Sequence, residues 1–405
     1  MIFHYPYPDR LALIPKPDLD SVKGNIIIYG TEITGDVTAH ALEQRGLEFI
    51  AFADSDKRKH GQKYLGHNII SPKELIDCHL NAIVLIASSS FRLILSTLVD
   101  LGLMMNQIYP CSHIIENVDL AGCILPFSEE LLIRSINRYN SGIFFFFNTS
   151  NYKIISELFI MPTTKCSLRC KECLFGIPNW NNRKNYDISQ IISLVNKLID
   201  LNYQIDTVSI IGGEPLLFHG LSTLVDELCN LSKVDHVTIV TNGTLSINEK
   251  LLTVLIKNKN KTIVRISNYG KVSYKVNEIE KILNENQVRY EDTKLDKWYK
   301  VPKIKNLKLS DNEVKMKYSQ CICCTKDTGR IYTLGERYYP CWFSMVVENR
   351  GFLLPENDFV YLYDYDLAVG INKLFTREKF LEACRYCMKS SKEMKISVPV
   401  AEQLL

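Results

Sequence analysis

The pattern of apolar and polar positions predicts two stretches in which buried strands alternate with helices. In the first stretch, residues 24–115, three short apolar runs are typical of buried strands: 25–29, 48–53 and 82–87. A helix is predicted over 37–45, and another is expected to begin at Pro72 with Ser71 as its N-cap. Strands that alternate with helices form parallel sheets with right-handed crossovers, so we expect a small α/β unit here.

The second stretch, residues 156–310, repeats this alternation on a larger scale. Its predicted strands are 158–161, 207–211, 236–241 and 262–266. Apolar residues recur at helical spacing over 187–201, and Asp187 is placed to cap that helix. This stretch therefore predicts a larger α/β domain with a parallel sheet.

The rest of the chain follows neither pattern. The apolar run at 143–147, within a connecting stretch, is predicted to be a buried strand. Residues 311–405 are rich in aromatic residues and cysteine, with a hairpin-like run at 330–341 and few clear helices. The expected organisation is three domains: 1–120, 150–310 and 311–405.

Composition excludes several classes of function. The chain has 405 residues, of which 46% are apolar and 23% charged, as in a globular protein with real cores. A net charge of +3 is too small to indicate binding to nucleic acid or to an acidic membrane surface. No apolar run approaches the roughly 18 residues of a membrane span. The first residues lack the basic-then-apolar order of a signal peptide, so a cytoplasmic location is expected.

Cysteine is abundant and clustered. Nine of the 13 cysteines fall into two groups, at 166–173 and 321–387. In a reducing compartment such groups indicate metal or catalytic sites rather than disulfides. The other four are isolated among apolar residues and are expected to be small buried hydrophobes: Cys78, Cys111, Cys123 and Cys229.

The first cysteine group follows directly on the predicted strand 158–161. Its spacing, Cys166-x3-Cys170-x2-Cys173, lets one loop wrap a single metal centre. Iron–sulfur cubanes normally take four cysteines, so three leave one iron open to a small molecule. A structural zinc site is the alternative, but zinc prefers four closed ligands, and the nearest downstream candidate is His219.

The strand at 207–211 ends in Gly212-Gly213-Glu214-Pro215. Two glycines at a strand end let a ligand approach the backbone closely. Glu214 supplies a carboxylate and the glycines expose backbone polar groups, which together suit an ammonium and amino-acid moiety.

These two motifs, in this order, resemble the radical SAM superfamily with its cluster loop and methionine-binding segment. The resemblance implies a partial (β/α)6 TIM-like barrel. It implies a [4Fe–4S] cluster on Cys166, Cys170 and Cys173, with S-adenosylmethionine (SAM) chelating the fourth iron. Electron transfer, from a donor such as flavodoxin or ferredoxin, would cleave SAM to methionine and a 5′-deoxyadenosyl radical that abstracts hydrogen from a substrate.

Polar residues at two further strand ends are candidates for binding SAM. Asn242 follows the strand at 236–241, and Ser267 and Asn268 close the next. The resemblance implies that residues at the latter position contact the SAM ribose; the alternative is that they are ordinary loop residues. Most family members carry an aromatic residue near the adenine where this chain has Glu172, so the chain departs from the family there.

The second cysteine group combines a hairpin-like run with a Cys-x2-Cys pair. Its members are Cys321, Cys323, Cys324, Cys341, Cys384 and Cys387. The pattern resembles the SPASM/Twitch extensions of radical SAM enzymes. That resemblance implies one auxiliary [4Fe–4S] cluster, held by the last three and by one of the first three. A zinc ribbon-like site is the alternative, because four thiolates are also what structural zinc prefers.

The N-terminal unit carries a turn close to a dinucleotide-binding fingerprint. Gly30 and Gly35 stand between a strand and a helix, and Asp54 ends the next strand. Glu32 occupies the middle glycine position, where a carboxylate would repel a pyrophosphate, so NAD binding is not expected. Residues 52–72 look like small Rossmann-like modules of nucleotide-sugar and polysaccharide enzymes; a docking domain without a ligand is equally compatible.

Three hypotheses about function follow. The first is a radical SAM enzyme that acts on a sugar, nucleotide-sugar or glycan, motivated by the N-terminal unit. The second is a radical SAM maturase of a peptide or protein, the commonest role of enzymes with SPASM-type extensions. The third is a non-catalytic metal scaffold, against which the segment 212–215 argues, since a scaffold needs no methionine site.

Overall fold

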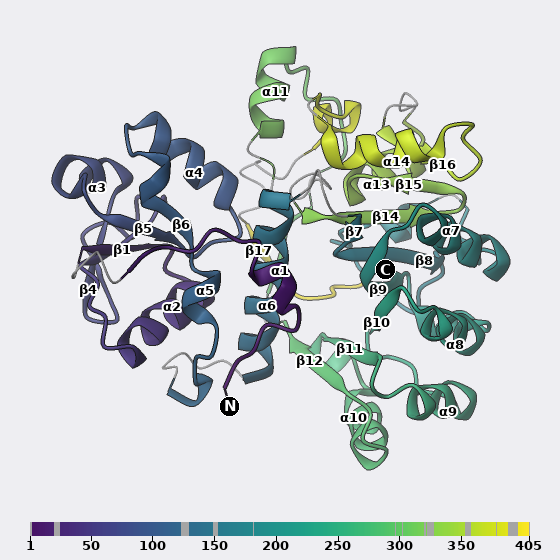
Figure 1. Ribbon diagram of the computed structural model, residues 1–405. Helices are drawn as coiled ribbons and strands as arrows, with labels where there is room; N and C mark the ends of the chain where they lie inside the picture. The colour runs from purple at the N-terminus through teal and green to yellow at the C-terminus, as the bar shows by residue number, and fades with distance from the viewer. Residues whose placement is uncertain are drawn as a thin grey trace. The chain divides into compact units, whose positions relative to one another are not determined.

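The computed structural model divides the chain into two compact units, Met1–Asn151 and Tyr152–Leu405 (Figure 1). It describes residues 2–19, 25–122, 129–148, 153–180, 182–295, 297–301, 303–319, 321, 328–352, 358–377, 379–387 and 396–404. Among these residues, no helix combines the length and the apolar character needed to cross a membrane.

The first unit is built on a six-stranded sheet with the order β3-β4-β2-β1-β5-β6, parallel except at β3. The strands are β1 Ile26–Tyr29, β2 Ala51–Ala53, β3 Lys63–Tyr64, β4 His67–Ile70, β5 Ile83–Ile86 and β6 Ile108–Pro110. The main helices are α2 Ile33–Gln44, α3 Pro72–His79 and α4 Phe91–Asp100. Every residue of β1 is buried, as expected for a parallel strand covered on both faces. The predicted cap is confirmed, because Ser71 Oγ accepts a hydrogen bond from the backbone N–H of Glu74 at 3.1 Å.

The prediction of a strand at 143–147 is wrong, because this run lies in helix α6, Glu129–Asn148. Buried positions along α6 recur at helical spacing: Leu132, Ile136, Tyr139, Asn140, Ile143 and Phe144. A short apolar run by itself cannot distinguish a buried strand from one end of a buried helix. Here the run continues the buried face of α6, so it packs as part of that helix.

The second unit is built on a sheet with the order β12-β11-β10-β9-β8-β14-β15-β16. Five of its strands are β8 Glu157–Thr163, β9 Gln204–Gly212, β10 Val234–Thr241, β11 Thr262–Asn268 and β12 Tyr290–Lys294; the short strand β7, Ile154–Ile155, also pairs with β9. Strands β8 to β12 run parallel to one another, which confirms the four predicted strands and the α/β class. The helices between them are α7 Ile188–Asp200, α8 Leu221–Asn230, α9 Glu249–Lys257 and α10 Val276–Glu285. Asp187 caps α7, as predicted, by accepting hydrogen bonds from the backbone N–H groups of Ser189 and Gln190.

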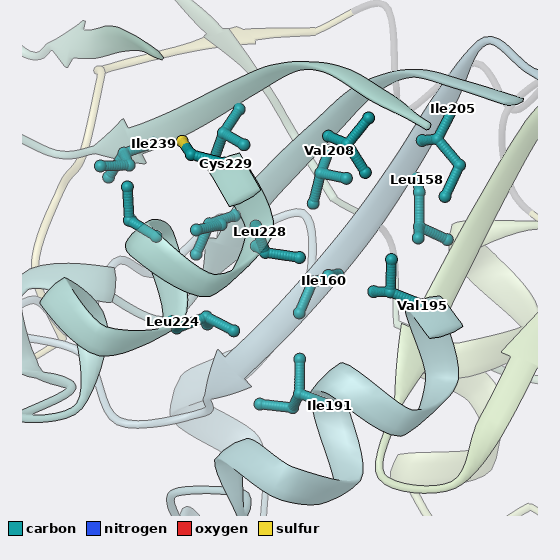
Figure 2. Packing of buried hydrophobic residues seen from close by; sticks show 14 of the residues in the cluster. Leu158, Ile160, Ile191, Val195, Ile205, Val208, Leu224, Leu228, Cys229 and Ile239 are labelled. Atoms are coloured by element: carbon teal, nitrogen blue, oxygen red, sulfur yellow. The ribbon is translucent and has the colours of Figure 1, made fainter. Parts of the chain in front are cut away.

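Alternate residues of these strands face the helices and form the main core. Leu158 and Ile160 of β8 and Val208 of β9 lie against side chains of α7 and α8 in Figure 2. Each fully buried aliphatic side chain of this kind contributes roughly 1.5–3 kcal/mol to stability. The core thus holds the strand ends, and the loops that follow them, in a fixed arrangement.

The opposite face of the same strands mixes aromatic and charged side chains. The Phe159 and Tyr332 rings stack with their centroids 4.5 Å apart. Glu157 pairs with Arg330 at 3.3 Å. Arg265 pairs with Glu291 at 2.7 Å. The stacked rings belong to an apolar cluster that includes Met161 and Ile211, so this face combines apolar surface with compensated charges.

The C-terminal region adds to the same sheet. Strand β14, Arg330–Leu334, lies parallel beside β8, and β15, Arg337–Tyr339, returns antiparallel to it, which confirms the hairpin. Strand β16, Val360–Tyr361, extends the hairpin, and the short strands β13, Trp298–Tyr299, and β17, Ser397–Val398, pair with each other. The expectation of few helices is wrong: the region contains α11 Asp311–Ser319, α13 Trp342–Asn349 and α14 Leu367–Thr376. The predicted domain boundary at 310 stays a prediction.

The isolated cysteines divide by position. Cys111 and Cys229 are buried, as predicted, but Cys78 is exposed, so that prediction is wrong. Cys78 lies on α3, a helix that buries only Leu75, which leaves the rest of its surface to solvent. Cys123 lies outside the described residues.

Candidate functional site

The loop after β8 carries the first cysteine group and is tied down at its base. Thr163 Oγ1 donates a hydrogen bond to the Asn185 side-chain oxygen at 2.7 Å and accepts one from the backbone N–H of Lys165 at 3.1 Å. Thr164 Oγ1 accepts a hydrogen bond from the backbone N–H of Lys184 at 2.8 Å. The buried threonines at the end of the strand therefore set the direction in which the loop leaves the sheet.

The three thiols of this loop lie close enough to influence one another. Cys170 is buried, Cys166 and Cys173 are partly buried, and all three are free. Burial raises the pKa of Cys166 to about 11, and the negative charges of Glu214, Cys170 and Cys173 raise it too, against a hydrogen bond from the Leu168 backbone. Three adjacent thiolates are thus costly without a cation, and an iron–sulfur cluster supplies that positive charge, so the residues fit the cluster that the motif implies.

A single-ion site is not formed by these or other side chains that the structure describes. Within the described ranges, no group of three or more histidine, cysteine, aspartate or glutamate side chains could hold one metal ion. A cubane presents separate iron atoms to separate thiolates, so its ligands need not converge on one point.

Gly212 and Gly213 hold the cysteine loop against the end of β9. A Cβ atom at Gly213 would lie 2.0 Å from the carbonyl oxygen of Lys165, and one at Gly212 would lie 2.4 Å from that of Thr163. Because glycine has no side chain, the two backbones can approach closely. The Gly213 N–H donates to the Thr163 carbonyl at 3.0 Å, and the Glu214 N–H donates to the Lys165 carbonyl at 2.8 Å. Gly212 also adopts φ +147°, which favours glycine. The predicted contact of a ligand with this backbone stays a prediction.

Glu214 is fully buried and joins two strand ends. Its carboxylate accepts hydrogen bonds from Thr241 Oγ1 at 2.8 Å, from the Asn242 N–H at 2.8 Å and from the Leu216 N–H at 3.0 Å. Burial raises the pKa of Glu214, and these donors act in the opposite direction. Its neighbour Pro215 begins the short helix η4, Pro215–Leu217.

Asn242 is brought directly to the cysteine loop. Its side-chain nitrogen lies 3.7 Å from Cys166 Sγ and donates to Ser167 Oγ at 3.1 Å. Its side-chain oxygen accepts from the backbone N–H and the hydroxyl of Thr244. The structure therefore gathers Cys166, Glu214 and Asn242, which are far apart in the sequence, at one edge of the sheet.

The end of β11 places an aromatic side chain near the thiols. Asn268 donates to Asp292 at 3.0 Å and accepts from the Gly270 N–H at 3.0 Å, so its amide is largely engaged. Burial raises the pKa of Tyr269; a hydrogen bond with Ser267 lowers it, and the charges of the three loop cysteines raise it further. The Tyr269 and Trp298 rings meet edge to face with centroids 5.1 Å apart.

The sequence analysis did not identify Tyr269, although its position directly after a predicted strand end indicated that it could lie at the site.

Glu172, where the chain departs from the aromatic residue of most family members, has a structural role. Its carboxylate accepts a hydrogen bond from the Val301 N–H at 2.7 Å, which ties the cysteine loop to the segment that follows β13. Tyr269 and Trp298 lie within the same unit and supply aromatic surface that Glu172 does not.

Three members of the second cysteine group pack against one apolar cluster. Cys341 precedes α13, while Cys384 and Cys387 belong to or follow the short helix η7, Glu382–Arg385. All three contact a cluster whose buried members are Phe343, Val347, Leu381 and Ala383. The structure therefore places these three cysteines around one apolar cluster, and their role as metal ligands stays a prediction.

Asp358 organises the turn that carries Cys384. It is buried, and its two carboxylate oxygens accept the backbone N–H groups of Glu382 and Ala383, each at 2.8 Å. Sequence reasoning missed this residue, because nothing near it in the chain indicates its partners.

The remaining candidates of the second group lie beyond α11. The backbone N–H of Cys321 donates to the Tyr318 carbonyl at 3.0 Å, and α11 packs against η7. Arg385 joins the two elements through Asp311 at 2.5 Å. Cys323 and Cys324 lie outside the described residues, so the fourth ligand stays open.

In the N-terminal unit, the candidate turn is closed by its own side chains. Asp54 accepts hydrogen bonds from Thr31 Oγ1 at 2.6 Å and from Lys59 Nζ at 2.9 Å. In a dinucleotide-binding domain an acidic residue in this region binds ribose hydroxyls. A Cβ atom at Gly35 would lie 2.1 Å from the Gly30 carbonyl oxygen, so Gly35 serves the contact between α2 and β1. The absence of NAD binding stays a prediction.

Two segments of the chain match protein-family models. Residues 22–109 match the family described as C2185-like, N-terminal, and residues 160–267 match the radical SAM superfamily. The GTP 3′,8-cyclase of Peptoclostridium acidaminophilum is 34% identical over 93 residues, 22% of this chain and 28% of that protein. The GTP 3′,8-cyclase of Clostridium perfringens is 29% identical over 148 residues, 33% and 44% of the two chains. The matched stretches thus span less than half the length of these curated relatives.

The crystal structure of BtrN in complex with AdoMet and 2-DOIA is 17% identical, with a TM-score of 0.38, and covers 62% of this chain and 98% of that one. Similarity at this level carries nothing about activity. The family match at 160–267 is more informative, because it includes the cysteine loop, the glycine pair and the ends of β10 and β11. Residues 160–267 are therefore a radical SAM domain.

Proposed function

We propose that this protein is a radical SAM enzyme, with a [4Fe–4S] cluster on Cys166, Cys170 and Cys173. The observation that carries the proposal is the gathering of three free, mutually interacting thiols on a loop that Gly213, Glu214 and Asn242 hold in place. When bound, the cluster and SAM supply reductive cleavage to methionine and a 5′-deoxyadenosyl radical that abstracts hydrogen from the substrate.

The chain's own residues divide the task of binding SAM. Gly212, Gly213 and Pro215 shape the turn beside the loop, and buried Glu214 fixes Asn242 against Cys166. Ser267 and Asn268 stand at the end of β11, where a ribose contact is proposed. Both already have partners in the chain, since the Asn268 amide bonds Asp292 and the Gly270 N–H, and Ser267 bonds Tyr269.

We further propose an auxiliary [4Fe–4S] cluster of the SPASM/Twitch type at the second cysteine group. Cys341, Cys384 and Cys387 share one apolar cluster, and one of Cys321, Cys323 and Cys324 would complete the set. Purified anaerobically, the protein should then contain about eight irons in two cubanes. Iron near four together with stoichiometric zinc would instead support the zinc alternative for this group.

For the substrate, we favour a sugar, nucleotide-sugar or glycan. The face of the sheet that carries the Phe159–Tyr332 stack also presents the paired charges of Glu157 with Arg330 and of Arg265 with Glu291. A substrate with both polar groups and a ring face, as a sugar has, would suit this mixture. The curated relatives are named for a reaction of GTP, which is compatible with a nucleotide-containing substrate. A peptide or protein substrate is the second candidate, favoured by the SPASM-like cysteine group.

The reducing electron would come from a flavodoxin or ferredoxin in the cytoplasm. Lys165, Arg169 and Lys171 are exposed on the cysteine loop and would attract an acidic donor.

The test is SAM cleavage by anaerobically reconstituted protein with a strong reductant. The wild type should form 5′-deoxyadenosine even without substrate, and Cys170→Ala should abolish this, because the cluster loses a ligand that it cannot replace. Cys78→Ala, which removes an exposed thiol on α3, is the matched control and should retain full activity. Wild-type activity in Cys170→Ala would refute the proposal.

A further inference from the structure

The last residues of the chain pair with the cysteine loop. Strand β17 pairs antiparallel with β13, and the chain then continues to the loop itself. There the Lys171 N–H donates to the Glu402 carbonyl at 2.7 Å, and the Leu404 N–H donates to the Arg169 carbonyl at 2.8 Å. These bonds form an antiparallel bridge between Cys170 and Gln403.

The side chain of Gln403 is held by three hydrogen bonds. Its oxygen accepts from the Arg169 N–H at 2.7 Å. Its nitrogen donates to Cys170 Sγ at 3.4 Å and to the Ala401 carbonyl at 2.6 Å. If the amide were flipped, its NH2 group would face the Arg169 N–H and its oxygen would face the Ala401 carbonyl. Neither contact is a hydrogen bond, so only one orientation of the amide fits this network. The N–H group is therefore aimed at the sulfur.

Both acceptors of the Gln403 amide lie in buried residues, although Gln403 itself is exposed. Cys170 is 8% exposed and Ala401 is 1% exposed, so the amide reaches from the surface to a buried sulfur. Ala401 adopts φ +50°, a left-handed conformation that is unusual for alanine and that turns the chain so that Gln403 meets the loop. A strained residue of this kind persists only where its surroundings hold it.

We propose that Gln403 is a positioning residue that donates an N–H···S hydrogen bond to the Cys170 ligand of the cluster and so raises the reduction potential of the cluster. This inference rests on the proposed function. Reduction adds negative charge to the cluster and its sulfur ligands, and an N–H dipole aimed at a sulfur stabilises the reduced form more than the oxidised form. The C-terminal residues thus make the cluster easier to reduce by its electron donor.

The experiment is a redox titration of the reconstituted full-length protein, followed by electron paramagnetic resonance of the reduced cluster. Gln403→Glu keeps an oxygen for the Arg169 N–H but replaces the donor to Cys170 with a carboxylate oxygen. We expect the equilibrium constant for reduction to fall at least tenfold, a potential 59 mV more negative for a one-electron couple. Gln403→Leu, which removes the amide without adding charge, should shift the potential in the same direction by a smaller amount.

Glu402→Gln is the matched control. It removes the ion pair with Lys171, whose atoms lie 3.3 Å apart on half-exposed side chains, and leaves the backbone bridge in place. Its potential should equal that of the wild type. An equal shift in Glu402→Gln, an unchanged potential in Gln403→Glu, or loss of iron from both Gln403 variants but not from Glu402→Gln would overturn the inference.

Failure of the proposed function looks different from failure of this inference. A wild-type protein without a reducible cluster on the loop would refute both. A wild type that cleaves SAM, together with a Gln403→Glu variant of unchanged potential, would refute the inference alone.

Discussion

The two units of this protein each place a glycine pair after a strand of a parallel sheet, yet the two pairs do different work. A Cβ atom at Gly35 or at Gly213 would lie about equally close to a backbone carbonyl, at 2.1 and 2.0 Å. At Gly35 that carbonyl belongs to Gly30, so the glycine closes the turn on itself. At Gly213 it belongs to Lys165, in the loop that carries three thiols. The same local requirement thus serves packing in one unit and site assembly in the other.

The acidic residue near each glycine pair, Asp54 in the first unit and Glu214 in the second, shows the same difference between local packing and site assembly. Asp54 finds Thr31 and Lys59 as partners within the N-terminal unit and is one-eighth exposed, at 13% of its side chain. Glu214 is fully buried and binds the backbone at the end of another strand, beside Cys166. A glycine motif with a carboxylate therefore identifies a close approach of two backbones. Such a close approach forms a functional site only where the neighbouring segment carries reactive side chains, as the cysteine loop does.

The largest expected effect comes from substituting the two glycines by alanine. Neither has a positive φ, so each substitution adds only the collision with a carbonyl. Gly213→Ala should displace the cysteine loop and lower SAM cleavage at least a hundredfold, with loss of iron. Gly35→Ala should cost about 1–3 kcal/mol of stability, as overpacking does, and leave the iron of the loop intact. Iron analysis, 5′-deoxyadenosine formation and thermal unfolding of both full-length variants check this, and equal iron loss in both would break the comparison.

A smaller effect is expected from Glu214→Ala. The substitution leaves the Asn242 N–H without its acceptor at the edge of the site, an unsatisfied group that costs about 1–3 kcal/mol. We expect SAM to bind about tenfold more weakly, equivalent to about 1.4 kcal/mol, with the iron content retained because all three thiols remain. Equilibrium binding of SAM and iron analysis measure the two quantities. In Asp54→Ala, the corresponding change in the N-terminal unit, SAM binding should be unchanged; a matching loss there would contradict the distinction between the units.

The last prediction is that NAD does not change the thermal stability of the protein. Glu32 repels a diphosphate at this turn, and Asp54 is engaged by Lys59. The thermal midpoint of the protein should not rise with millimolar NAD, whereas a specific ligand at a hundredfold excess over its dissociation constant would add about 2.7 kcal/mol. A clear rise with NAD would show that the turn binds dinucleotides after all. A rise with a UDP- or GDP-sugar alone would favour the glycan hypothesis over the peptide one.

Much of the site was predictable because strand ends and short-range spacing are local properties. The carboxyl ends of β8, β9, β10 and β11 follow from apolar runs, and parallel strands bring those ends to one edge. Cys166, Cys170 and Cys173 share one loop, so their proximity needs no long-range information. The caps Ser71 and Asp187 were likewise readable, since each bonds backbone within three residues of itself.

The tertiary structure decided what lies opposite each of these local features. The run at 143–147 is equally apolar in a strand or a helix, and its place in α6 depends on what the helix packs against. Cys78 is exposed because only one side of α3 is covered. Gln403 reaches Cys170 across more than 230 positions, and Asp358 caps a turn more than 20 residues away. A buried polar group is satisfied by whichever partner folding brings to it, and hydrophobic periodicity, which records only the buried face of each element, does not contain that partner's identity.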